Sequence, residues 1–103
     1  MKKKLAKVTQ LENKNQFVIE TEKDLYFQSY DSVCARYNKK NNYLYLHKDW
    51  DYSNTTRKHL YIFISEWCNL AALEDAILYA KSKRAEIKKM IKNKVIRIDK
   101  NLD

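Results

Sequence analysis

Residues 33–47, VCARYNKKNNYLYLH, contain the pattern that decides the fold. Two runs rich in aromatic and aliphatic residues, 33–37 and 43–47, flank a polar segment that contains three Asn residues. Aromatic and β-branched side chains favour strands, and Asn tolerates the left-handed conformations that tight turns need. The stretch therefore predicts a β-hairpin.

The second strand of this hairpin has two different faces. Alternation places Leu44 and Leu46 on one face of the sheet, with Tyr43, Tyr45 and His47 on the other. We expect the aliphatic face to contribute to the core.

Further strand signals lie on both sides of the hairpin. Residues 16–19 and 25–30 predict an earlier pair of strands, separated by a polar segment. Residues 95–98 alternate well enough for a short strand that could add to the sheet edge before a polar tail. Residues 1–14 are interpreted as a basic leader.

A helix is expected over residues 57–67, where Leu60, Phe63, Ile64 and Trp67 recur at helical spacing. Hydroxyl and amide side chains in residues 53–56 can cap its start, with Ser53 or Asn54 as the cap. The β-branched and aromatic content of this segment also permits a strand.

Residues 70–93 predict a long amphipathic helix. One stripe of this helix is mostly apolar and contains Leu73, Ile77, Ala80, Ile87 and Ile91. An adjacent stripe is basic and contains Lys81, Lys88 and Lys92. Together these elements predict a single α+β domain, an antiparallel sheet of four to five strands packed with two helices, the second long and basic.

Positive charge is concentrated at the two ends of the chain. The net charge is +8, with +4 in residues 1–14 and +6 in residues 81–103. Clustered positive charge attracts nucleic acid, an anionic membrane surface or an acidic protein, without selecting among them. No stretch has the ~18 apolar residues of a membrane span or the apolar core of a signal peptide, so a soluble, cytoplasmic protein without a membrane partner is expected.

The sequence offers little catalytic machinery. It contains no Gly, which excludes Gly-rich phosphate loops, dinucleotide fingerprints and the nucleophile turn of G-x-S-x-G hydrolases. Neither of the two His residues is placed by any motif beside a nucleophile and an orienting group. We therefore expect a protein that binds rather than one that catalyses a reaction.

Cys34 and Cys68 are too few and too far apart to predict a disulfide framework, and a reducing cytosol is their natural compartment. They could converge on zinc with His47 and His59, but the paired short spacings of structural zinc sites are missing. We interpret both as small buried hydrophobic residues, and expect no metal and no cofactor.

Two groups of residues could contact a polyanion. Tyr43 and Tyr45, with Tyr26 and Tyr30 as further candidates, would share a sheet face with Arg36 nearby. Aromatic and basic groups on a sheet stack bases in several single-strand binders; alternatively, the helices cover this face. A basic helix face would follow a phosphate backbone, although it would equally suit an ordinary solvated surface. The residues of that helix face are Lys81, Lys88, Lys89 and Lys92.

Residues 52–60, YSNTTRKHL, resemble a Y-S-x-T-T-x-K-H-L motif of small uncharacterised phage and mobile-element proteins. The resemblance extends over about residues 25–67 and implies a mobile-element origin and a binding role, without any catalytic residue. From physical chemistry alone, cations in a first helical turn oppose the helix dipole, which suggests an external anionic partner or a tolerated cost. These cations are Arg57, Lys58 and His59.

Two functions follow as hypotheses. The first is a non-catalytic binding module for nucleic acid or a nucleoprotein. The second is an anti-defence inhibitor of the anti-CRISPR type, which would act by protein contact with a host nuclease complex.

Overall fold

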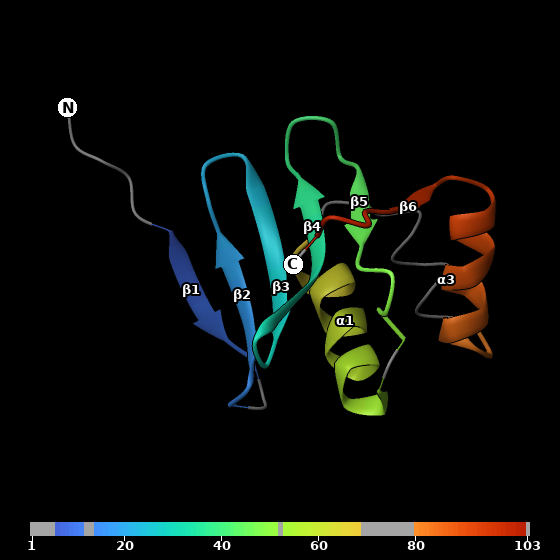
Figure 1. The fold of residues 1–103 in the computed structure, drawn as a ribbon, viewed down its shortest axis with the longest axis horizontal. Coiled ribbons are helices and arrows are strands. Elements are labelled where there is room, and N and C mark those ends of the chain that lie inside the picture. Colours follow the sequence, from blue (N-terminus) through green and yellow to red (C-terminus); the bar gives the residue numbers. More distant parts are fainter. Residues whose placement is uncertain (1–5, 12–13, 52, 69–79, 103) are drawn as a thin grey trace.

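A computed structural model of the chain describes residues 6–11, 14–51, 53–68 and 80–102. These residues form one six-stranded sheet with two helices, an α+β fold (Figure 1). The elements are β1 (Lys7–Gln10), β2 (Gln16–Glu20), β3 (Asp24–Ser29), β4 (Ser32–Asn38), β5 (Leu44–Leu46), α1 (Asn54–Glu66), α3 (Lys83–Lys92) and β6 (Ile96–Ile98).

The strands follow one another across the sheet in chain order. Strands β1 to β5 form an antiparallel meander, and β6 pairs with β5 in parallel. The sheet therefore has more strands than the four to five expected, and it is mixed rather than wholly antiparallel. The additional strand, β1, lies inside the segment interpreted as a basic leader, which pairs with β2 despite its exposed Lys7 and Val8.

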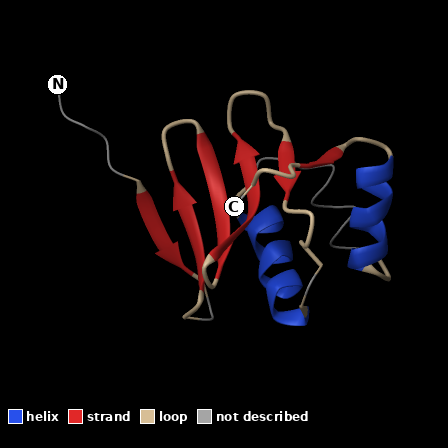
Figure 2. Cartoon of the chain, viewed as in Figure 1, coloured by secondary structure: helices blue, strands red, loops and turns tan. Residues whose placement is uncertain are grey.

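Helix α1 covers one face of the sheet (Figure 2). The ring of Phe63 stacks on that of Phe27, with centroids 5.9 Å apart, and both side chains are fully buried. Leu44 and Leu46 are buried as expected, and a further seven strand and helix side chains in this core are less than 3 % exposed. They are Val18, Ala35, Tyr37, Leu60, Ile64, Ile87 and Ile96.

Ser53 caps α1, as the sequence predicted: its Oγ accepts a hydrogen bond from the backbone N–H of Thr56 at 3.1 Å. The helix begins three residues before the expected start at residue 57. Neither described helix is long and apolar enough to cross a membrane.

The expectation of one continuous helix over residues 70–93 is wrong in its central part. Residues 80–82 are not helical, and Ser82 caps α3 by accepting from the N–H of Ala85 at 3.2 Å. A capping hydroxyl interrupts the apolar stripe at this point, and the stripe alone did not reveal it. The part of the expected helix in residues 70–79 lies outside the described residues.

Three described residues adopt positive φ without being glycine: Tyr30, Asn42 and Lys94. Asn42 turns the chain between β4 and β5, which is the role expected of Asn in a glycine-free chain. Lys94 follows α3. Its backbone N–H donates to the carbonyl of Ile91, and the backbone N–H of Val95 donates to the carbonyl of Met90. A helix that ends in this way usually has glycine at the position that Lys94 occupies.

We expect Lys94→Gly to raise the free energy of unfolding by about 1 kcal/mol, because glycine has no Cβ to clash in the left-handed conformation. Urea denaturation of the two proteins measures this difference. Lys100→Gly, at an exposed position for which no positive φ is found, is the control and should not raise stability. An unchanged or lower stability of Lys94→Gly would contradict the expectation.

Candidate nucleic-acid interface

Six residues, one from each strand, stand opposite one another in a row across the sheet face that faces away from Phe27. The strand registers pair each with the next: Val8, Ile19, Tyr26, Arg36, Tyr45 and Arg97. None of the six is buried. Within the described ranges, the helix that lies over the sheet is α1, and it packs on the opposite face. This face is therefore partly open.

Two guanidinium groups stack on tyrosine rings at one end of this row. The Cζ of Arg36 lies 4.5 Å from the ring centroid of Tyr45, and the Cζ of Arg97 lies 4.4 Å from that of Tyr43. The two tyrosine rings meet edge to face at 6.5 Å between centroids. We call these four residues the Arg–Tyr cluster. It gathers planar groups, of which Tyr43 and Arg97 are exposed.

The two arginines differ in their electrostatic surroundings. Arg36 lies 3.7 Å from a carboxylate oxygen of Asp24 and 4.0 Å from one of Asp99. No carboxylate of the described residues lies within 4.0 Å of Arg97. The charge of Arg36 is thus largely offset, whereas Arg97 presents a positive charge at the edge of the sheet.

Further cations flank the cluster on α3, which packs beside β6 (Figure 1). Lys88, Lys89 and Lys92 are exposed, while Ile87 and Met90 turn into the core. The sequence had grouped these lysines as a binding surface, and the structure places them beside the strand that carries Arg97. Lys81, in the same expected group, lies before the helix and is exposed.

Asp51 fixes the start of α3. Its carboxylate accepts from Arg84 at 3.0 and 3.1 Å and lies 4.0 Å from Lys88. Its backbone carbonyl accepts from Arg57 at 2.6 Å. One residue thereby ties the segment before α1 to both helices, so Arg57 and Arg84 have structural partners.

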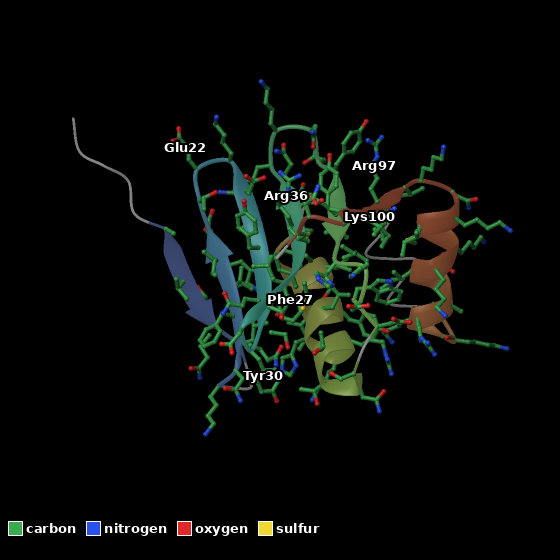
Figure 3. All side chains as sticks on the ribbon, in the orientation of Figure 1. Glu22, Phe27, Tyr30, Arg36, Arg97 and Lys100 are labelled. Carbon is green, nitrogen blue, oxygen red and sulfur yellow. The ribbon has the colours of Figure 1, made fainter. Side chains whose placement is uncertain are left out.

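The expected cluster at the start of α1 is not one exposed surface. His59 is 3 % exposed and its Nδ1 lies 2.8 Å from the Thr55 carbonyl oxygen, so a partner cannot reach it. Lys58 is exposed, and Arg57 also donates to the Asn54 side chain. The structure does not bring this helix end to the Arg–Tyr cluster: Figure 3 labels Arg36 and Arg97 at the opposite end of the sheet from Tyr30, next to which α1 begins. Tyr52, the first residue of the motif, lies outside the described residues.

Cys34 and His47 line a pocket of about 660 Å³ together with hydroxyl side chains near the start of α1. The His47 Nδ1 accepts from the Asp49 backbone N–H at 3.0 Å. Cys34 and Cys68 are buried, as expected, and form no disulfide. Burial raises the pKa of Cys68, which keeps its thiol protonated at neutral pH. In the described part of the chain, no three His, Cys, Asp or Glu side chains are grouped so that they could hold a metal ion.

Arg97 is the residue of this interface that sequence reasoning missed. Its alternation with Ile96 and Ile98 predicts that it faces away from the core, but only the parallel pairing of β6 with β5 places it opposite Tyr45. Asp24 and Asp99, which offset Arg36, were likewise not singled out.

Comparison with known proteins gives a family and no activity. No curated protein matches this chain, and no solved structure does. A family model described as "Family of unknown function (DUF8033)" matches residues 2–78, a range that includes β1 to β5 and α1 and ends before α3 and β6. The chain belongs to this family of unknown function, DUF8033.

Proposed function

We propose that this protein is a non-catalytic binding protein for nucleic acid, and that its binding surface consists of the Arg–Tyr cluster and the lysines of α3. The observation that supports this proposal is the pair of arginine–tyrosine stacks on a partly open sheet face, beside an exposed basic helix. Cations attract the phosphate backbone, and planar side chains offer surfaces to bases.

A cytosolic location is part of the proposal. It is supported by Cys34 and Cys68, which form no disulfide, because cysteines that stay reduced are typical of reducing compartments. A mobile-element origin, implied by the sequence motif, is compatible with a protein that meets nucleic acid in a host cytosol.

The salt dependence of binding tests the contribution of α3. Each phosphate contact adds about 0.7 to 0.9 units to the slope of log K against log salt concentration. We expect the triple variant Lys88→Glu, Lys89→Glu, Lys92→Glu to lower this slope by about 2 to 3 units and to weaken binding strongly at low salt. Fluorescence anisotropy with labelled oligonucleotides at several salt concentrations measures both.

The matched control makes the same change of net charge at the other edge of the sheet, with Lys7→Glu, Lys14→Glu and Lys23→Glu. These three side chains are exposed and belong to the β1–β3 region. Equal slopes in the two triple variants would mean that only the overall charge matters. Absence of nucleic-acid binding at low salt, with capture of a nuclease-resistant protein complex from host lysate, would favour the inhibitor function instead.

A further inference from the structure

We infer that the ligand is single-stranded nucleic acid, whose unpaired bases stack on the Arg–Tyr cluster while its phosphates lie toward α3. This inference rests on the proposed function and names its substrate class. The distribution of charge and of planar groups across the open face supports it.

The charges on this face disfavour a phosphate at its centre. Asp24 and Asp99 lie beside Arg36, so a phosphate placed over the middle strands would approach two carboxylates. The cations of the proposed surface that have no carboxylate of the described residues within 4.0 Å are Arg97, Lys89 and Lys92, and they lie at the flank, on β6 and α3. A double helix presents phosphates on its outside and keeps its bases paired, and would therefore bring charge to the unfavourable centre. A single strand can turn its bases inward and its phosphates outward.

Planar side chains lie on the part of the face where the bases of such a single strand would be. Tyr45 pairs in register with Arg36 on one side and with Arg97 on the other, and neighbouring strands are about 4.8 Å apart. Arg97 covers one side of the Tyr43 ring, and Tyr43 remains 42 % exposed. Arginine planes and tyrosine rings both stack with bases, and such stacking tolerates any base sequence.

The row continues from the cluster to Tyr26, the register partner of Arg36. Beyond it lie Ile19 and Val8, of which Val8 is 59 % exposed. These apolar surfaces carry no charge that would repel or attract phosphate, and they can contact the faces of further bases. The row therefore offers surfaces for bases, while the phosphates stay at the flank toward β6 and α3.

The test separates stacking from charge by keeping the charge constant. Arg97→Lys retains the positive charge but removes the guanidinium plane, and Tyr43→Ser removes an exposed ring. We expect each to weaken binding of a labelled fifteen-nucleotide oligothymidylate by about 5- to 150-fold, the range found for loss of one base stack. Tyr43→Phe, which keeps the ring, should bind as the unaltered protein does. A matched oligouridylate distinguishes RNA from DNA as the preferred strand.

Binding of a hairpin duplex with the same number of phosphates is measured in parallel. Weaker binding of the duplex than of the single strand, with the salt slope unchanged in Arg97→Lys, supports the inference. The inference would be overturned if single strand and duplex bound equally well and if Arg97→Lys and Tyr43→Ser, with unchanged melting temperatures, bound as tightly as the unaltered protein. The proposed function would still stand in that case. If no variant and no form of nucleic acid binds, the proposed function itself fails.

Discussion

Phe27→Ala is expected to lower the free energy of unfolding by about 3 to 5 kcal/mol, because it leaves a cavity where a fully buried ring stacks on Phe63. Phe17→Ala, at a half-buried position of the neighbouring strand, is expected to cost only about 1 kcal/mol. The two phenylalanines lie on opposite faces of the same sheet, since Phe17 pairs with Gln28 and Phe27 with Val18. Chemical denaturation of both variants gives the comparison.

This pair of variants bears directly on the candidate interface. The Arg–Tyr cluster lies on the Phe17 face, and its proposed role requires that this face remain accessible. A loss of stability in Phe17→Ala as large as that in Phe27→Ala would show that the face is covered as deeply as the core, and would leave no room for a ligand on it.

The strands could be predicted from the sequence where their alternation is strong. The hairpin of β4 and β5 and the pair of β2 and β3 follow the period of two in residues 16–47, and both were found in antiparallel register. Strand β1 could not be recognised in this way, because its four residues include Lys7 and Val8 on a largely exposed edge and bury almost nothing. β1 is held by backbone hydrogen bonds to β2, and the hydropathy of its side chains does not reveal that pairing.

The first helix shows how packing decides an ambiguous segment. Residues 57–67 carry β-branched and aromatic side chains that suit a strand, yet all but Trp67, the C-cap, lie in α1, because Leu60, Phe63 and Ile64 must face the sheet together. His59, which the sequence suggested as a contact, is buried on the same side. Short polar residues around it, such as Ser53 and Thr56, identify a cap and do not indicate what the following turn buries.

The candidate interface was only partly predictable. Alternation in β5 indicates that Tyr43 and Tyr45 face away from the leucines, and the hairpin brings Arg36 opposite Tyr45. Whether helices cover that face depends on the path of the chain after β5, which no local pattern fixes. The position of Arg97 depends on that same path, because β6 returns beside β5 only after both helices.

Gln16→Leu is expected to raise the free energy of unfolding by about 1 to 3 kcal/mol, the range that leaving a buried polar group unsatisfied costs. Gln16 is fully buried on the helix-covered face, and neither its Oε1 nor its Nε2 has a hydrogen-bond partner among the described residues. Leucine has a similar volume and needs no partner. The comparison by urea denaturation uses Gln28→Leu as the control, since the Gln28 amide lies on the other face and donates to the Tyr30 carbonyl at 2.7 Å.

Gln28→Leu should therefore not raise the free energy of unfolding. It should lower it slightly if the hydrogen bond from Gln28 to the carbonyl of Tyr30, a residue with positive φ, contributes to stability. The neighbour of Gln16 across the strands is Ser29, whose Oγ lies 3.0 Å from the Thr56 Oγ1, so a polar network already reaches this part of the interior. A loss of stability in Gln16→Leu would mean that the amide has a partner there, such as an ordered water joined to that network, and that the buried polar group stabilises the packing of α1 on β2.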